Sequence, residues 1–530
     1  MAATVDVVFL DDLWVQGRAT GQRELLDVDS VAGHLLKPGS GFAFLAMHRR
    51  ELFPDEMFAD LFPTGRGRPS VPADVMASVI TLQALHGLSD AETVDAVTYD
   101  LRWKAACGLP VTAVAFHATT LTYWRRRLAR SGRPNRIFEA VKLVVAETGV
   151  LTGKTRRALD STILDDAVAT QDTVTQLIAA IRRVRRDVAG AAEVIAGQCN
   201  AHDYDEAGKP VIAWDDEQAR AELVDALVSD AHRLLGHLPE QELGPKAAES
   251  VALLALIAGQ DVEPAGGSDG TDGRWRIAQK VAPDRVISVI DPDSRHAHKT
   301  RTHHQDGFKA HVAVEPETGI FTAGRLTKAS GPDTSDGALA DELLAGENAP
   351  CDVLGDCGYG SVETRSTLLD AEHRTVIKPM PVPTVIAGGF TYDDFDIDPR
   401  AGTATCPAGH TRRIPNSRRV NFAVHCRDCP VRARCTTSPH GRWITVHPRD
   451  DLLRAARRQA ETVEFQQTYR QHRPMVERGI AWLTRAGNRR VRYRGVANND
   501  QWLQHRMAAL NLRRMITLGL GRREGVWAVS

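Results

Sequence analysis

Residues 351–378, CDVLGDCGYGSVETRSTLLDAEHRTVIK, decide the class of fold. The run from Cys351 to Gly355 is short and apolar enough for a buried strand, and it ends in Asp356. Ser361 can cap a helix that continues to Ala371, and residues 374–378 read as a further strand. A strand, a helix and a strand in this order are typical of an α/β domain.

Further strands and a helix are predicted on the N-terminal side of this stretch. Residues 158–162 predict a short strand that ends in an acid at Asp160, and residues 286–290 predict another strand. Residues 307–314 and 319–326 predict a hairpin, and residues 335–345 predict a helix. These elements indicate an α/β core on a mixed sheet, assembled from residues 151–172 and 280–380.

Four other segments complete the predicted domain organisation. Residues 173–279 predict a helical insertion, with helices at 173–196, 216–238 and 245–258 before a flexible loop at 259–273 that is rich in Gly, Asp and Ser. Residues 381–448 predict a Cys-rich insertion, and residues 449–530 predict a basic, helical C-terminal part of the core. Residues 1–150 predict short helices, at 70–85, 90–97 and 119–128, which suit a helix-turn-helix DNA-binding domain or an ordinary helical bundle.

Composition places the chain among soluble globular proteins of several domains. It has 530 residues, 43% hydrophobic and 25% charged, and no apolar run of the roughly 18 residues that a membrane span needs. The first residues lack the basic start and apolar core of a signal peptide. We therefore expect a cytoplasmic, nucleoid-associated protein whose cysteines are reduced or bind metal.

The formal net charge of -1 conceals a separation of charge along the chain. Residues 400–530 contain 26 arginines, no lysine and eight acids, which gives +18 there and −19 in the remainder. Arginine suits bidentate contact with phosphate, so this segment predicts DNA binding. Two alternatives stay open, namely a codon bias that favours arginine over lysine and an internal ion-pair face that docks on the acidic remainder.

Particular side chains are candidates for contact with DNA. Residues 488–495 interleave arginine with an aromatic residue, and residues 125–127 are three arginines in a predicted helix. The candidates are Arg473, Arg478, Arg485, Arg489, Arg490, Arg492, Tyr493, Arg494, Arg125, Arg126 and Arg127.

Three acids are candidates for a catalytic site. Asp160 and Asp356 each follow an apolar strand, and neighbouring strand ends direct side chains into one cleft. Glu477, on the predicted helix that contains Arg473, is the candidate for a third carboxylate. Three carboxylates suit two Mg²⁺ or Mn²⁺ ions for phosphoryl transfer. Each acid can instead be a loop cap or a surface ion-pair partner, and Arg473 can pair with Glu477 at i,i+4.

Two further acids and a group of histidines are secondary candidates. Asp165 and Asp166 are alternatives to Asp160. The histidine cluster at residues 296–304 can bind a metal, but phosphate or backbone contacts are the favoured interpretation.

The cysteines crowd between residues 406 and 435. Cys406, Cys426, Cys429 and Cys435 can satisfy a tetrahedral zinc ion, and a Cys-x2-Cys spacing lets two sulfurs reach one metal. Such a site is closed and structural, and it would supply the core that this segment lacks. The alternative is four unrelated reduced cysteines.

Five motifs in order resemble a DDE transposase of a bacterial insertion sequence, in the branch of insertion sequence 1182, over about residues 40–515. They begin at Asp160-Ser-Thr, Asp291-Pro-Asp-Ser-Arg, Gly307-Phe-Lys-Ala-His, Gly355-Asp-Cys-Gly-Tyr-Gly and Glu477-Arg-Gly-Ile-Ala-Trp-Leu. The resemblance implies an RNase H-like core with a triad of Asp160, Asp356 and Glu477, and an N-terminal DNA-binding domain. Relatives often carry Tyr-x2-Arg-x3-Glu-x6-Lys, where this chain has Arg470 at the Tyr position, Tyr469 one residue earlier and Thr484 at the Lys position.

The expected function is therefore metal-dependent cleavage of DNA at the ends of an insertion sequence and strand transfer into target DNA, by a homodimer that holds two terminal inverted repeats. The alternatives are an RNase H-like nuclease or resolvase that cuts without joining, and a non-catalytic DNA-binding protein descended from a transposase.

Overall fold

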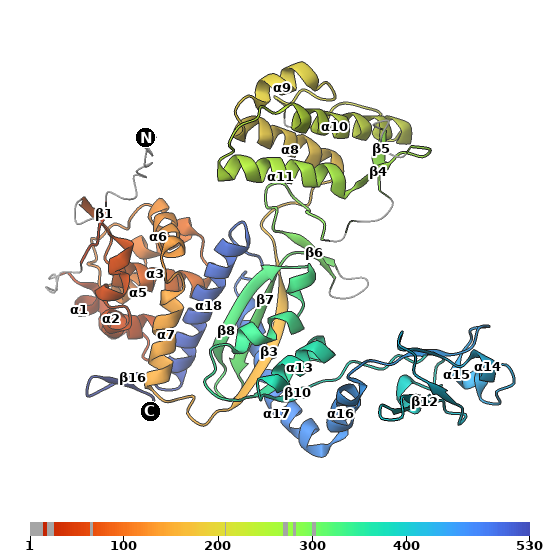
Figure 1. The fold of residues 1–530 in the computed structure, drawn as a ribbon. Coiled ribbons are helices and arrows are strands. Elements are labelled where there is room, and N and C mark those ends of the chain that lie inside the picture. The colour runs from red at the N-terminus through yellow and green to blue at the C-terminus, as the bar shows by residue number, and fades with distance from the viewer. Residues whose placement is uncertain are drawn as a thin grey trace, which may run out of the picture.

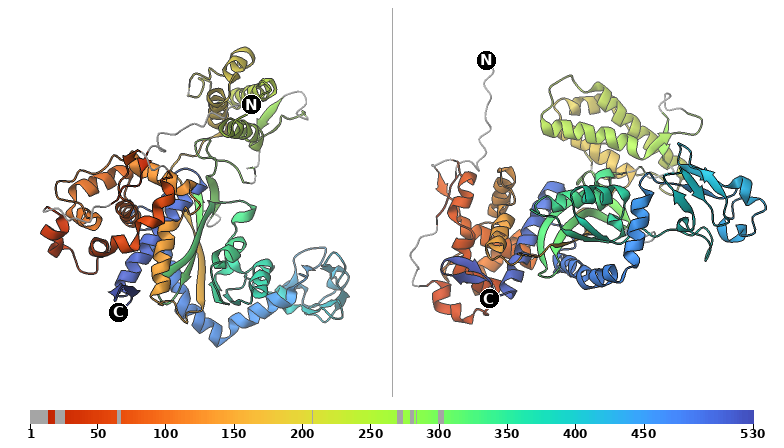
Figure 2. Two further views of the ribbon diagram at one scale, coloured as in Figure 1. Left: turned by 60° about the vertical axis from the view of Figure 1, so that its left-hand side comes forward. Right: turned by 60° about the horizontal axis from the view of Figure 1, so that its bottom comes forward.

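The computed structural model describes residues 14–18, 26–63, 67–206, 208–268, 274–278, 282, 284–298 and 304–530. A mixed β-sheet lies at the centre, with N-terminal helices to one side (Figure 1). Two insertions leave the sheet in different directions, and the further views show both as separate lobes (Figure 2).

The N-terminal unit is helical. Its α3 is buried along most of its length and ends at Gly87, whose φ of 70° is the left-handed conformation that commonly terminates a helix. Ser89 and Glu92 then form a reciprocal capping box at the start of α4. The three helices predicted here are confirmed. The elements are β1 (Trp14–Val15), α1 (Val28–Ala32), α2 (Gly41–Leu52), β2 (Arg68–Pro69), α3 (Ala73–His86), α4 (Asp90–Tyr99), α5 (Leu101–Cys107), α6 (Thr119–Arg130) and α7 (Arg136–Glu147).

The central sheet has the order β10-β9-β3-β7, with β8 and β6 both paired to β7. β3 runs parallel to β9 and antiparallel to β7, and β9 runs parallel to β10. This mixed sheet is compatible with an RNase H-like core. The strands are β3 (Arg156–Asp165), β6 (Arg295–His298), β7 (His304–Glu315), β8 (Ile320–Lys328), β9 (Asp352–Gly355) and β10 (Arg374–Ile377).

Helices cover both faces of the sheet because side chains alternate between the faces along each strand. Leu159 and Val353 pack in one cluster with α12 (Ala340–Leu344) and α13 (Val362–Asp370). Ala158 and Leu354 face the other way and join the large core that includes α17 (Val463–Thr484) and α18 (Val496–Thr517). α16 (Asp450–Glu461) precedes α17, and β16 (Gly521–Arg523) with β17 (Val526–Ala528) forms a hairpin after α18.

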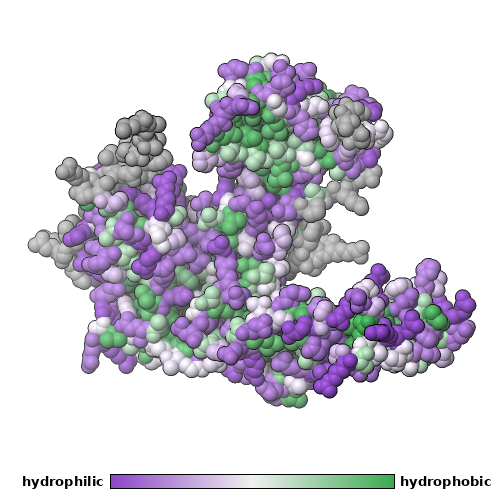
Figure 3. Space-filling model, viewed as in Figure 1, coloured by the Kyte–Doolittle hydropathy of each residue, from purple (hydrophilic) through white to green (hydrophobic). Residues whose placement is uncertain are grey.

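The helical insertion has its own apolar core, formed by α8 (Thr173–Asp187), α9 (Ala191–Gln198), α10 (Glu217–His237) and α11 (Pro245–Gln260). The single helix predicted for residues 173–196 is wrong, because Gly190 takes a left-handed φ of 77° and starts α9 anew. The flexible loop predicted for residues 259–273 contains a strand, β4 (Val262–Pro264), which pairs with β5 (Trp275–Ile277) just after it. Hydrophobic side chains gather on the face of this lobe seen in Figure 3.

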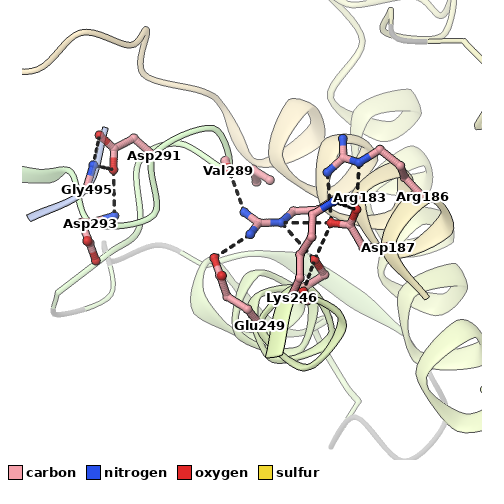
Figure 4. Close-up of polar contacts among 10 residues, drawn as sticks. Arg183, Arg186, Asp187, Lys246, Glu249, Val289, Asp291, Asp293 and Gly495 are labelled. Atoms are coloured by element: carbon pink, nitrogen blue, oxygen red, sulfur yellow. Dashed lines mark hydrogen bonds and ion pairs between the residues drawn. The ribbon is translucent and has the colours of Figure 1, made fainter. Parts of the chain in front are cut away.

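Ion pairs and backbone contacts tie the insertion together and join it to the segment that leads back to the sheet. Arg183 reaches Glu249 at 2.5 Å and the Val289 carbonyl at 3.3 Å, and Lys246 pairs with Asp187 at 2.7 Å (Figure 4). Residues 286–290 do not form the predicted strand, because Val286 and Val289 pack into the core of the helical insertion instead.

The Cys-rich insertion is a small unit around Phe395, Phe422 and Ile444. Its elements are β11 (Asp396–Asp398), β12 (Thr403–Thr405), β13 (Thr411–Arg413), β14 (Arg419–Asn421), α14 (Ala423–Cys426), α15 (Arg432–Cys435) and β15 (Trp443–Thr445). Cys406 lies in a tight turn, since the Cys406 and Gly409 amides donate hydrogen bonds to the His410 and Cys406 carbonyls, at 2.9 and 2.8 Å.

Candidate active site and nucleic-acid interface

Asp160 and Asp356 lie at the same level of two adjacent parallel strands. Ala158 pairs with Leu354, so each aspartate stands two residues beyond this pair. The prediction that β3 ends at Asp160 is wrong, because residues 161–165 continue the strand through pairing with β7. Asp356 does follow the last residue of β9, and its carboxylate accepts a hydrogen bond of 2.8 Å from the Gly358 amide.

The carboxylate of Asp160 is largely buried and has a cationic partner. Burial raises its pKa, Arg473 opposes that rise, and the charge of Asp356 adds to it. The Arg473 guanidinium lies 3.1 Å from Asp160 Oδ1 and donates a 2.8 Å hydrogen bond to the Leu159 carbonyl. Arg473 therefore neutralises one of the candidate acids inside the protein.

Tyr469, Arg473 and Glu477 follow one side of α17, because residues four apart share a helix face. Burial raises the pKa of Tyr469, which also senses Arg473, Asp356 and Asp160. Val476 and Gly479 pack toward the sheet, where a methyl group on Gly479 would lie 3.3 Å from Phe321.

Glu477 stands at the edge of this cluster rather than inside it. Its side chain is exposed, and no hydrogen bond or ion pair joins it to Asp160 or Asp356, although all three lie in the described part of the chain. The structure thus brings together Asp160, Asp356 and Arg473 and leaves Glu477 one helical turn away.

The donor chemistry at these acids suits a hard divalent cation. Within the described residues, no group of three or more His, Cys, Asp or Glu side chains is arranged to hold a metal ion. Mg²⁺, however, is often bound through one or two carboxylates with substrate phosphates and water as the other ligands. Asp160 and Asp356 fit that requirement.

The alternative acids Asp165 and Asp166 have structural partners. Asp165 accepts a 3.0 Å hydrogen bond from Gln305, and its backbone bonds to Arg489 and Val491, both at 2.8 Å. Asp166 accepts a hydrogen bond from Ser294.

The basic turn, residues 485–495, is fixed on the end of β3 by those backbone bonds. Its other end is fixed at the start of α18, where Asp291 accepts from the Gly495 amide at 3.1 Å and Asp293 accepts from the Val496 amide at 3.0 Å. Acids at a helix N-terminus stabilise it. Residues 291–293 therefore position the basic turn, as part of Figure 4 shows.

Arginines of the basic turn divide between internal contacts and exposure. Arg489 donates to the Ile163 carbonyl at 3.2 Å, Arg490 donates to the Asp166 carbonyl at 2.9 Å, and Arg492 donates to the Gly87 carbonyl. These bonds use only part of each guanidinium. Exposed residues among the predicted DNA contacts are Arg126, Arg478, Arg485, Arg489, Arg490 and Arg494.

A groove of about 630 Å³ lies between this turn and the N-terminal unit. Arg490, Arg492 and Tyr493 line one side, and Ser89 and Asp90 at the start of α4 line the other. The groove thus joins the two predicted DNA-binding regions.

Arg125 and Arg127, two of the three predicted DNA contacts on α6, have structural partners. Arg125 pairs with Asp90 at 2.5 Å and stacks on Tyr493, with its guanidinium carbon 4.9 Å from the ring centre. Arg127 donates to the Leu61 carbonyl at 2.6 Å and stacks on Phe62.

The four clustered cysteines line one cavity. Cys406, Cys426, Cys429 and Cys435 surround about 20 Å³, enough for one water-sized particle. Burial raises the pKa of Cys435, and the other three thiols act in the same direction. Their sulfur set matches that of a structural zinc site, although their arrangement is not that of a formed metal centre.

The predicted histidine cluster is only partly described. The His296 ring lies 2.5 Å from a carboxylate oxygen of Asp306. His303 lies outside the described residues.

Sequence reasoning missed the aromatic and acidic side chains beside Asp356. Tyr359 is fully buried, and burial raises its pKa well above the usual value, with added effects from Asp336, Asp160 and Asp356. Nothing local in the sequence marks Asp336. Tyr469 is four residues before Arg473, so helical spacing alone places the two side chains on one face. The family motif puts its tyrosine at position 470 instead, and comparison with that motif therefore passes over Tyr469.

Comparison with protein families links two segments to transposases. Residues 46–127 match a transposase domain (DUF772), and residues 405–516 match a transposase DDE domain. The first match spans α3, α4 and α5, and the second spans most of the Cys-rich insertion, Glu477 and the basic turn. Together they support a DDE transposase. No curated protein and no solved structure matches the chain.

No helix in the described part of the chain is long and apolar enough to cross a membrane.

Proposed function

We propose that this protein is a DDE transposase, of the branch of insertion sequence 1182, that cleaves DNA at the ends of its element and joins the freed 3′-OH to target DNA. The observation that carries the proposal is the placement of Asp160 and Asp356, each two residues beyond a paired position of adjacent parallel strands, with α17 beside them. The matches to two transposase families support the assignment to DDE transposases.

Asp160, Asp356 and Glu477 are the acids proposed to hold two divalent cations. When bound, Mg²⁺ or Mn²⁺ ions polarise the scissile phosphodiester and lower the pKa of the attacking water. Arg473 favours the ionised form of Asp160 at its buried position, because the ion pair offsets part of the cost of burial, although burial still raises the pKa of Asp160. Glu477 is exposed and lies one helical turn from Arg473 on the same side of α17.

The basic turn and the groove beside it are the proposed path of the DNA backbone. Their exposed guanidinium groups can bind phosphates, and the groove extends from the core to α4. Since phosphate contacts release counterions, we expect end binding to weaken steeply with salt. We further propose that a homodimer holds two terminal inverted repeats and acts in the cytoplasm, at the nucleoid.

Zinc is the proposed structural ion of the Cys-rich insertion. The four thiols line a cavity of ion size, and the surrounding apolar core is small. When bound, zinc would supply folding free energy to this unit.

The decisive experiment incubates purified protein with its terminal repeats and Mg²⁺ and resolves the products on a denaturing gel. We expect Asp356→Ala to abolish cleavage while binding of end DNA survives. Asp370→Asn, which changes an exposed acid at the end of α13, is the matched control and should cleave normally. Cleavage by Asp356→Ala at the wild-type rate would remove this residue from the site.

The same reaction separates the alternative functions. Joined products with target DNA identify a transposase, whereas cutting without joining identifies a nuclease or resolvase. Binding without any Mg²⁺-dependent nicking identifies a non-catalytic DNA-binding protein.

A further inference from the structure

A further acid, Asp336, lies directly beside Asp356. It precedes the short helical turn Gly337–Leu339 that leads into α12. A Cβ built on Gly358 would lie 2.6 Å from Asp336 Oδ2 and 3.0 Å from Asp356 Oδ1. The two carboxylates therefore converge on one point, and only a residue without a side chain fits between them.

The surroundings of Asp336 are buried and polar. On β7, the Lys309 ammonium stands 2.8 Å from Asp336 Oδ1, and His311 Nδ1 stands 3.6 Å from the same oxygen. The side chain of His311 is fully buried, and that of Asp336 is 19% exposed. Tyr359, also fully buried, senses the charges of Asp336, Asp160 and Asp356.

Three polar atoms in this cluster lack a hydrogen-bond partner among the described residues. They are His311 Nδ1, Asp336 Oδ1 and the Tyr359 hydroxyl, all buried. Buried polar groups without partners are rare and costly. Lys309 contributes charge to Asp336 but does not form an aligned hydrogen bond with it. The cluster is thus built for a group that the protein chain does not itself provide.

We propose that Asp336 acts with Asp356 as a second carboxylate for the divalent cation of the active site, an inference that rests on the proposed function. A carboxylate pair is the donor set that Mg²⁺ or Mn²⁺ takes together with phosphate and water. Lys309 balances the charge of Asp336 in the metal-free protein, and His311 lies on the same side of the carboxylate. Asp336 belongs to the connection before β9, so this ligand comes from a part of the chain separate from α17.

The test measures Mn²⁺ binding by titration calorimetry, with and without end DNA, on the full chain. We expect Asp336→Asn to weaken Mn²⁺ binding at least tenfold, in the range found when groups around a metal are altered. Asp333→Asn, an exposed acid three residues earlier, is the matched control and should bind within twofold of wild type. Equal Mn²⁺ affinity of Asp336→Asn and wild type would overturn the inference.

A second variant tests the same geometry without removing a charge. Gly358→Ala places a methyl group between the two carboxylates, so we expect a similar loss of Mn²⁺ affinity while thermal unfolding in EDTA changes little. Raising Mn²⁺ should restore cleavage by Asp336→Asn, which loss of a purely structural ion pair with Lys309 would not allow. Failure of this rescue would also count against the inference.

The outcomes distinguish this inference from the function on which it rests. If wild-type protein neither binds Mn²⁺ nor cleaves end DNA, the proposed function fails. If wild type does both and the Asp336 and Gly358 variants bind Mn²⁺ normally, only the role of Asp336 fails.

Discussion

Replacing Arg473 by methionine should expose how strongly the core depends on the ion pair with Asp160. The two side chains are 7% and 16% exposed, and the charged atoms lie 3.1 Å apart. Removing one partner of a buried pair leaves an uncompensated charge and typically costs about 3–5 kcal/mol. Because the Asp160 end of this pair is partly solvated, we expect about 3 kcal/mol, the lower end of that range, at pH 8.

The pH dependence of this loss of stability follows from the direction in which the pKa of Asp160 is shifted. Burial already raises the pKa of Asp160, and loss of Arg473 raises it further. When the pKa of an acid is higher in the folded than in the unfolded state, the folded state binds more protons between the two pKa values. The free energy of unfolding therefore falls as pH rises through that interval. The penalty of Arg473→Met should therefore be smaller at pH 5 than at pH 8.

Hydrogen exchange of the β3 amides, followed by mass spectrometry and corrected for intrinsic rates, measures the free energy of opening this strand without assuming that the whole chain unfolds in one step. Arg470→Met, on the exposed side of the same helix, is the control and should change it by less than about 0.5 kcal/mol. In an Asp160→Asn background the Arg473 substitution should cost much less, since no buried carboxylate remains. A loss below about 1 kcal/mol at pH 8, or an equal loss at both pH values, would refute the role assigned to this pair.

Three further outcomes are expected. Cys429→Ser should lower the zinc content measured by atomic absorption and the melting temperature of the Cys-rich insertion, and unchanged zinc would contradict a four-cysteine site. Arg490→Gln should weaken binding of end DNA similarly for all sequences and reduce the slope of log affinity against log salt by about one, whereas an unchanged slope would place Arg490 outside the phosphate path. Asp291→Ala should destabilise the start of α18 by about 1 kcal/mol and speed hydrogen exchange at Gly495, and unaltered exchange there would argue against the capping role.

Much of the fold followed from local patterns. The hairpin at residues 307–326 and the helix capped by Ser361 were predictable because alternation and capping are local signals. The extension of β3 beyond Asp160 was not, since Ser161 and Thr162 interrupt the apolar run and residues 161–165 become part of the strand by pairing with β7. For residues 286–290 a strand was predicted and none formed. An apolar run has the same sequence pattern whether it joins a sheet or packs on helices, as this one does.

The site divides in the same manner. Asp160 and Asp356 could be paired in advance because each followed an apolar run, and parallel neighbours bring such positions together. Asp336 could not be assigned to this site from the sequence, because its approach to Asp356 depends on a turn at Gly358 and on the course of the chain after β8. The internal partners of Arg125 and Arg473 likewise depend on tertiary contacts, although their charge alone had suggested DNA.

The position of α18 has a consequence for how the chain reaches its folded state. This helix is buried over most of residues 499–512, and it contacts α3, α7 and β8. Arg506 within it donates to backbone carbonyls at the ends of both α3 and α17. One segment therefore completes the packing of both the N-terminal unit and the central sheet. A chain that stops before residue 496 leaves the apolar surfaces of α3, α7 and β8 that face this helix uncovered at once, so the N-terminal unit and the central sheet complete their packing together.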